Sequence, residues 1–144
     1  MNDRFKMIAS SYVFLIKDGK ILLSRRFQTG YEDGNYSLPA GHVEDGETLT
    51  GCLIREAKEE IGIDIDKKDI SLVYVMHRKE TDIRVDFFFT TTKWIGTPTN
   101  CEPKKCDDLS WFALNALPKN TVPYIRAAIE GWIKGEIYQE RWGI

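Results

Sequence analysis

The chain has 144 residues, a length that favours one globular domain spanning residues 1–144 and leaves too little sequence for two separate cores. Hydrophobic residues make up 42% of it and charged residues 29%, a composition that excludes disordered and collagen-like chains. Twenty basic residues against twenty-two acidic ones give a formal net charge of -2, so the overall positive field needed to grip long nucleic acid is missing.

Cysteine content and hydropathy indicate the compartment. The longest apolar run near the start, Met7–Ile16, is too short to cross a bilayer and has no basic leader followed by a cleavage site. An odd, sparse set of cysteines does not build the disulfide framework of a secreted protein. We therefore expect a cytoplasmic protein that does not engage membranes; its three cysteines are Cys52, Cys101 and Cys106.

The first elements in chain order are strands. Two β-rich runs, Tyr12–Ile16 and Ile21–Leu23, flank an Asp-Gly pair, which is a strong signal for a β-hairpin. A polar, glycine-bearing loop follows over Phe27–Asn35, and Tyr36–Pro39 is predicted to be a short extended segment that proline ends. This loop is long enough to border a binding site.

The next segment, Glu47–Ile61, is predicted to be a helix. Leucine, alanine and isoleucine recur in it every fourth residue, which is the spacing of one helix face. Gly62 stands where a left-handed C-terminal cap is expected, because glycine adopts that backbone conformation without a Cβ clash. The apolar positions are Leu49, Leu53, Ala57 and Ile61.

The second half of the chain begins with another predicted hairpin, made by Ile70–Met76 and Ile83–Phe89 with Arg78–Asp82 as its polar link. In the second of these strands apolar residues alternate with mostly polar ones, so we expect one buried face that includes Phe87 and Phe89.

A loop over Gly96–Asp108 and a short strand around Ser110–Phe112 complete the predicted sheet. A second helix is then expected, capped by Asn120 or Thr121, with Pro123 in its first turn and Gly135 at its end.

Three carboxylates fall within five residues of the first helix, at Glu56, Glu59 and Glu60. At helical spacing they share one side of the helix and can converge on one point, with Glu60 at the edge of the apolar stripe. Carboxylates at such a desolvated boundary take up protons unless a cation compensates them. Hard carboxylate oxygens without histidine or thiolate partners select Mg²⁺, or Mn²⁺ as a substitute, and Mg²⁺ commonly joins carboxylates to substrate phosphates.

A simpler alternative is an ordinary surface helix on which Arg55 and Glu59 form an i,i+4 ion pair. The residues around the carboxylates decide between the two interpretations. The segment reads Gly41, five residues, Glu47, seven residues, and then Arg-Glu-Ala-Lys-Glu-Glu-Ile-Gly-Ile over residues 55–63.

This pattern resembles, at every position, the box that defines the Nudix hydrolases, here with a small Ala57 where a larger aliphatic residue is more usual. The order of hairpin, box helix, hairpin, strand and closing helix is similar to that family over most of the chain. The resemblance implies the α/β class, as an α/β/α sandwich around a mixed sheet with a box helix and a C-terminal helix. It also implies hydrolysis of a nucleoside diphosphate linked to a further group.

Carried over position by position, the resemblance implies that Glu56, Glu59 and Glu60 bind the divalent ion, with the backbone carbonyl of Ala40 as another ligand. Supporting roles go to three further residues: Gly41 permits a close approach, and an arginine fork on a carboxylate braces the loop and the helix. The braced pair is Glu47 and Arg55.

Water is expected to attack phosphorus without a covalent intermediate, helped by a general base that is either Glu59 or Glu102. A solvated loop acid is the alternative interpretation of Glu102. Arg25 and Arg26 could contact phosphate oxygens and Tyr31 could stack on a base, although all three also fit purely structural roles.

Substrate signatures for ADP-ribose, dinucleoside polyphosphates, NADH and coenzyme A are not found after the box. By elimination we expect a MutT-like pyrophosphohydrolase that cleaves a (d)NTP, with a normal or an oxidised base, to the monophosphate and pyrophosphate. A nucleoside diphosphate sugar or alcohol is the alternative substrate, and a catalytically silent nucleotide-binding module is a third hypothesis. The expected partners are a small nucleotide and no long nucleic acid, with a homodimer left open.

Overall fold

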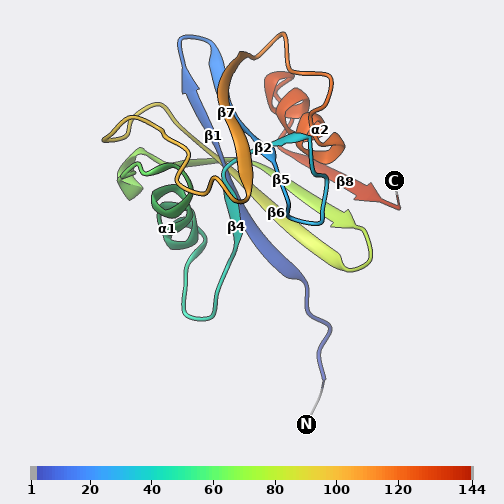
Figure 1. Ribbon diagram of the computed structural model, residues 1–144. Helices are drawn as coiled ribbons and strands as arrows, with labels where there is room; N and C mark the ends of the chain where they lie inside the picture. Colours follow the sequence, from blue (N-terminus) through green and yellow to red (C-terminus); the bar gives the residue numbers. More distant parts are fainter. Residues whose placement is uncertain (1–2, 144) are drawn as a thin grey trace.

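The computed structural model of the protein describes residues 3–143. In this part of the chain one sheet of eight strands lies between two helices, α1 (Leu49–Ile61) and α2 (Pro123–Ile133), and a short 3₁₀ turn, η1 (Lys67–Asp69), follows α1 (Figure 1). No helix among these residues is long and apolar enough to cross a membrane. The strands are β1 (Ile8–Lys17), β2 (Lys20–Arg26), β3 (Tyr36–Ser37), β4 (Ala40–His42), β5 (Ser71–Lys79), β6 (Ile83–Thr91), β7 (Cys106–Ala113) and β8 (Tyr138–Trp142).

The sheet is mixed. Its main path runs β3-β2-β1-β6-β5-β8, with β4 paired to β1 and β7 paired to β2. The β1/β6 and β5/β8 pairs are parallel and the other pairs are antiparallel. One helix covers each face, so the predicted α/β/α sandwich with a mixed sheet is confirmed.

Alternating side chains of β1 supply both cores, which explains why the strand is buried without interruption from Ser10 to Leu15. Phe14 packs on the α2 side with Phe88. Val13 and Leu15 pack on the α1 side with the apolar stripe of that helix. At about 25 cal/mol for each Å² of buried apolar surface, these two layers provide most of the favourable free energy of folding.

Strand β1 also divides the sheet. Near its end it pairs with β2 through Ile16 and Lys17, whereas nearer its start the same edge pairs with β4 through residues 10–12. Between these stretches β2 and β4 diverge, and a backbone bond from the Val13 amide to the Pro39 carbonyl (3.1 Å) bridges the opening. The divergence places the residues around Ala40 at the mouth of a cleft.

The caps of α1 are only partly as predicted. The helix begins at Leu49 rather than Glu47, because the Thr48 hydroxyl accepts a hydrogen bond from the Gly51 amide (3.0 Å) and so caps it. Gly62 has φ +72° and ends the helix, as expected. Glu47 is left in the preceding loop.

Three predictions for the second half of the chain are wrong. The residue that precedes α2 is Val122 rather than Asn120 or Thr121, and it makes no side-chain capping bond. The chain continues beyond Gly135 into β8, which has no alternating apolar pattern and was not predicted. β5 extends to Lys79, so Arg78 belongs to the strand and not to the polar link.

Strand β6 is covered on both faces, whereas its alternation predicted a single buried face. Asp86 and Phe88 are fully buried on the α2 side, Phe89 is buried on the other side, and Phe87 is only partly buried. The reason is that α2 packs over the face on which the polar residues alternate.

A buried ion pair accounts for the polar residues of that face. The Arg78 guanidinium donates from Nε to Asp86 Oδ2 at 2.8 Å and lies 3.6 Å from the centre of the Tyr124 ring. Tyr12 donates its hydroxyl to Asp86 Oδ1 at 3.0 Å. Burial alone would lower the pKa of Arg78, but the Asp86 hydrogen bond and the neighbouring tyrosines raise it above its ordinary value, so the guanidinium stays charged in the core.

We expect Arg78→Met to lower the free energy of unfolding by about 3–5 kcal/mol, because Asp86 would be left as an uncompensated buried charge. Urea unfolding followed by circular dichroism measures this change. Arg84→Met is the control: it breaks the more exposed pair with Asp82, 2.8 Å long, and should cost less than about 1 kcal/mol. Equal losses in both variants would contradict a special role for the buried pair.

Candidate active site

The box residues form a bracket between β4 and α1. Arg55 donates two hydrogen bonds to Glu47, from Nε to Oε2 at 2.6 Å and from Nη2 to Oε1 at 2.9 Å. The Glu44 amide donates to Glu47 Oε1 at 2.9 Å. The Arg55 fork, and then this amide, hold the pKa of Glu47 at about 2. The structure thus places Glu47 and Arg55 where the loop before α1 meets the helix.

Arg55 also holds two of the three helix carboxylates. Its Nη1 lies 2.7 Å from Glu56 Oε1 and 3.2 Å from Glu59 Oε2. The Glu59 side chain is 54% exposed, whereas that of Glu56 is 18% exposed. The i,i+4 pair of the simpler interpretation therefore exists, but the same arginine also reaches into the box.

Glu60 has a different environment. Its Oε1 accepts a hydrogen bond from the Ala40 amide at 2.9 Å, which links α1 to β4. Burial raises the pKa of Glu60 well above its ordinary value, against the effect of this bond, and the nearby charges of Glu56 and Glu102 raise it further. Burial also raises the pKa of Glu56, partly offset by Arg55. These carboxylates are in the unfavourable state that a bound cation relieves.

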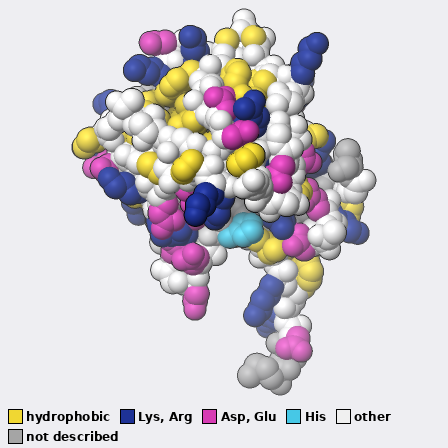
Figure 2. Space-filling view, viewed as in Figure 1, with side chains coloured by type: hydrophobic (Ala, Val, Ile, Leu, Met, Phe, Trp, Pro, Cys, Tyr) yellow, Lys and Arg dark blue, Asp and Glu magenta, His cyan; other side chains and the backbone are white. Residues whose placement is uncertain are grey.

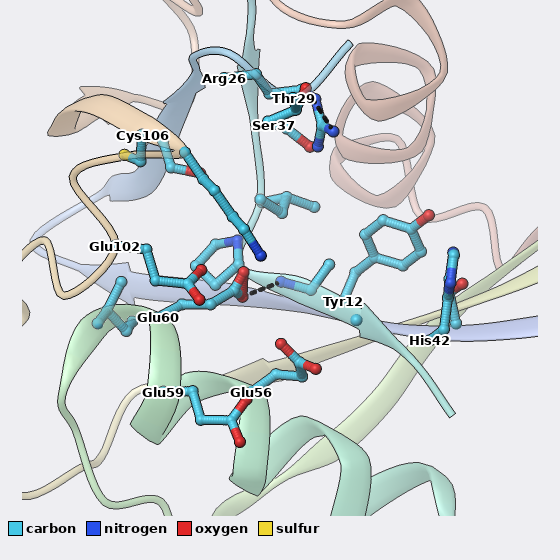
Figure 3. Close-up of a pocket in the computed structure, with 18 of the residues that line it drawn as sticks. Tyr12, Arg26, Thr29, Ser37, His42, Glu56, Glu59, Glu60, Glu102 and Cys106 are labelled. Carbon is cyan, nitrogen blue, oxygen red and sulfur yellow. Dashed lines mark hydrogen bonds between the residues drawn. The ribbon is translucent and has the colours of Figure 1, made fainter. Parts of the chain in front are cut away.

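A pocket of about 740 Å³ opens beside these carboxylates, and its walls include Glu56, Glu59, Glu60 and Glu102. We call this part of the pocket the acidic end. Figure 3 shows Glu60 and Glu102 facing one another there, with Glu56 below them and with Tyr12 and His42 at the opposite end. In Figure 2, acidic side chains gather on the lower part of the molecule, over α1 and the loop before it.

The carboxylates do not converge as the helix projection predicted. Within residues 3–143, no three histidine, cysteine, aspartate or glutamate side chains lie close enough together to enclose a metal ion. The reason is that Arg55 holds Glu56 and Glu59, while the Ala40 amide holds Glu60. The donors are still hard oxygens that suit Mg²⁺, but Glu56 and Glu59 would have to turn away from Arg55 to bind it.

Gly41 is required by this arrangement. A Cβ at this position would lie 2.3 Å from Glu56 Cδ, so any larger residue displaces that carboxylate. The sequence indicated a close approach here but not the group that approaches.

The predicted substrate contacts all lie near the pocket, but each is already bonded within the protein. Arg25 pairs with Asp107 at 2.7 Å, and Arg26 donates from Nε to the Tyr31 carbonyl at 2.6 Å. Tyr31 donates its hydroxyl to Glu80 at 2.6 Å and is 39% exposed. Their geometry favours shaping the pocket wall over free contact with a ligand.

Sequence reasoning missed the end of the pocket opposite the carboxylates. His42, to which no sequence motif gave a role, lies on this wall with its Nε2 3.3 Å from Arg84 Nη1. The Ser10 hydroxyl is also on the wall, is only 2% exposed and has no hydrogen-bond partner among the described residues. Tyr12 and Tyr124 complete this region, which we call the aromatic end. No local motif marks these residues, because separate elements bring them together.

Comparison with known proteins fits this geometry. The model of the NUDIX domain matches residues 7–131, most of the chain. The chain belongs to the NUDIX family.

Solved structures of similar proteins agree with this fold. A MutT NUDIX hydrolase from Burkholderia pseudomallei is similar with a TM-score of 0.80 and 28% identity, over 88% of this chain and 98% of that one. A MutT protein from Methanosarcina mazei Go1 shares the fold alone, with a TM-score of 0.77 and 23% identity over 89% and 94% of the two chains.

Curated relatives include proteins named NAD-capped RNA hydrolase NudC. The one from Stutzerimonas stutzeri is 27% identical over 116 residues, which are 81% of this chain and 40% of that protein. The one from Pseudomonas entomophila is 30% identical over 117 residues, 79% of this chain and 40% of that protein. The chain therefore spans about two fifths of the length of these relatives.

We expect Gly41→Ala to lower the rate of nucleotide hydrolysis roughly 10- to 100-fold, since the added methyl group displaces Glu56 from the acidic end. Initial rates with saturating nucleotide and Mg²⁺ measure the effect. Gly51→Ala adds the same methyl group within α1, where it meets only the Thr48 hydroxyl at 3.0 Å, and should leave the rate unchanged. A fully active Gly41→Ala enzyme would argue against a role for Glu56.

Proposed function

We propose that this Nudix hydrolase cleaves a nucleoside triphosphate, with Mg²⁺, to the nucleoside monophosphate and pyrophosphate. The observation that carries the proposal is the acidic end, where Glu56, Glu60 and Glu102 share one pocket wall. Burial makes the charged forms of Glu56 and Glu60 costly, a cost that a cation beside them offsets, and a Mg²⁺ ion that keeps open positions takes phosphate oxygens. The likeness to a MutT NUDIX hydrolase over nearly the whole length of that chain supports placing this protein among the MutT-like enzymes.

The proposed ligands of the ion are Glu56, Glu59, Glu60 and the Ala40 carbonyl, with Mn²⁺ as a possible substitute for Mg²⁺. A divalent ion bound there supplies positive charge that offsets the charge developing on the phosphates. The Ala40 amide fixes Glu60 on the wall, and Arg55 holds Glu47 so that the loop before α1 keeps its shape.

Of the two candidate general bases, we propose Glu102 before Glu59. Glu59 is 54% exposed and bonded to Arg55, whereas Glu102 faces Glu60 at the acidic end of the pocket (Figure 3). The Glu102 amide is held by the Asn100 side chain at 3.0 Å, which fixes the loop that carries it. A carboxylate there can take the proton of a water that attacks phosphorus.

The aromatic end is the proposed site of the organic part of the substrate. Tyr12 and Tyr124 lie on the wall of this end, and Ser10 offers a buried hydroxyl without a partner among the described residues. A buried polar group normally finds a hydrogen-bond partner, so a ligand atom at Ser10 would remove an unfavourable state. Unlike the acidic end, this region can make both apolar contacts and hydrogen bonds with a ligand.

A second candidate is a substrate in which the diphosphate joins a nucleoside to a sugar, an alcohol or a second nucleotide. The relatives named NAD-capped RNA hydrolase favour the dinucleotide form of this alternative. Their name also conflicts with the expectation that long nucleic acid is not a partner of this protein. For this chain the net charge of -2 still disfavours extended RNA contacts.

A nucleotide panel with Mg²⁺ and product identification by chromatography separates these substrates. For a triphosphate pyrophosphohydrolase we expect pyrophosphate and the monophosphate as products. Two monophosphates from NAD⁺ or a nucleoside diphosphate sugar would instead establish the second candidate. Release of orthophosphate alone would contradict both.

We expect Glu60→Gln to lower kcat by a factor of about 100 or more, because it removes a charge from the acidic end. The same change should leave the melting temperature unchanged or raise it, since a buried carboxylate near two others costs stability. Steady-state kinetics and thermal unfolding measure the two effects. Glu130→Gln, on the exposed side of α2, is the matched control. Normal turnover in Glu60→Gln would refute the assignment.

A further inference from the structure

A phosphate chain in the pocket needs positive side chains that are free to contact it, because phosphate oxygens leave water only for charged or hydrogen-bonding partners. Five side chains with a permanent positive charge line the pocket. They differ in how far the protein already uses their charge. The five are Arg25, Arg26, Arg55, Arg84 and Lys105.

The two arginines at the end of β2 are engaged. Arg25 donates from Nε to Asp107 at 2.7 Å, and this hydrogen bond is the main cause of its raised pKa. Arg26 donates to the Tyr31 carbonyl at 2.6 Å and to the Thr29 hydroxyl at 3.1 Å. Arg25 is therefore held against β7, and Arg26 holds the loop that follows β2.

The other two arginines are engaged as well. Arg55 is shared among the box carboxylates, with its shortest bond, 2.6 Å, to Glu47. Arg84 pairs with Asp82 at 2.8 Å and lies 3.3 Å from His42. A phosphate could recruit either one only by breaking a contact that the protein already makes.

Lys105 is different. Its ammonium group makes no hydrogen bond or ion pair with any other residue in the range 3–143, although the side chain is on the wall of the same pocket as Glu60 and Glu102. Its backbone is fixed, because the Lys105 amide donates to the Glu102 carbonyl at 2.9 Å and the Phe27 amide donates to the Lys105 carbonyl at 2.9 Å. A held backbone and an uncommitted charge are what a ligand contact requires.

We propose that Lys105 binds a phosphate of the substrate at the acidic end of the pocket. An ammonium group is a compact charge with three donors, and it contacts phosphate oxygens without the fixed geometry that an arginine fork demands. Its position on the loop of Glu102 places a positive contact beside the acids, so that the phosphate chain meets both a cation and the carboxylates. The inference rests on the proposed function in one respect, namely that the phosphate chain lies in this pocket.

The test compares Lys105→Met with Lys104→Met, because both lysines are exposed but only Lys105 is on the pocket wall. We expect Lys105→Met to raise KM for the best triphosphate of the panel, and the inhibition constant of inorganic pyrophosphate, about tenfold or more, with kcat changed less than about threefold. Lys105→Arg should recover most of the affinity. Lys104→Met should match the unmodified enzyme.

Three outcomes would overturn the assignment. An unchanged KM and inhibition constant in Lys105→Met would show that Lys105 does not contact the phosphate. Equal effects of Lys104→Met and Lys105→Met would show only loss of general positive charge. Full activity in both Glu60→Gln and Lys105→Met would contradict the proposed function itself, because it would show that this pocket is not the active site. If Glu60→Gln is inactive and the KM of Lys105→Met is unchanged, only the role of Lys105 is contradicted.

Discussion

The hydrogen bond from the Ala40 amide to Glu60 is the contact on which the site depends. It joins α1 to β4 at the point where β1 stops pairing with β4 and the sheet opens toward β2. Without it, a carboxylate would be buried with no donor, a state that costs several kcal/mol or forces protonation. The bond holds this negative charge at the wall of the pocket and leaves the remaining cost of burial for a cation to relieve. Glu60 therefore both joins α1 to β4 and belongs to the proposed active site.

Arg55 has the complementary role. In the structure it neutralises the carboxylates that would otherwise repel one another, at 2.6 Å from Glu47 and 2.7 Å from Glu56. The same guanidinium that shapes the loop before α1 therefore keeps Glu56 and Glu59 from converging with Glu60. A divalent ion bound as proposed would compete with Arg55 for Glu56 and Glu59 but not for Glu47, which accepts two hydrogen bonds from the fork. The brace can persist while the other carboxylates move, which reconciles a fixed loop with an acidic end that is not gathered in advance.

The sequence predicted the parts of the molecule that local patterns encode. The β-rich runs of the two hairpins correspond to strands, and the apolar residues at every fourth position correspond to α1. The glycine cap at Gly62 is where α1 ends. Burial of Arg78 and Asp86 was missed, because only the packing of α2 over β6 makes that face internal. β8 was missed because it is an edge strand with exposed residues on one side, so that pairing with β5 rather than its own pattern defines it. The candidate site divides in the same way: the box spacing gives Glu56, Glu59 and Glu60, whereas the free state of Lys105 depends on what every other cation contacts.

The difference between residues marked by a local motif and residues brought together by the fold explains why the reaction is easier to infer than the substrate. The acidic end comes from one continuous segment, the box, together with the loop of Glu102, and its spacing is tied to the geometry of a single helix. The aromatic end takes Ser10 and Tyr12 from β1, His42 from β4 and Tyr124 from α2, elements that are distant in sequence and carry no common motif. Proteins with the same box can therefore cleave the same bond while holding different groups beside it. The occurrence of MutT hydrolases and NAD-capped RNA hydrolases among the similar proteins is the pattern that this arrangement predicts.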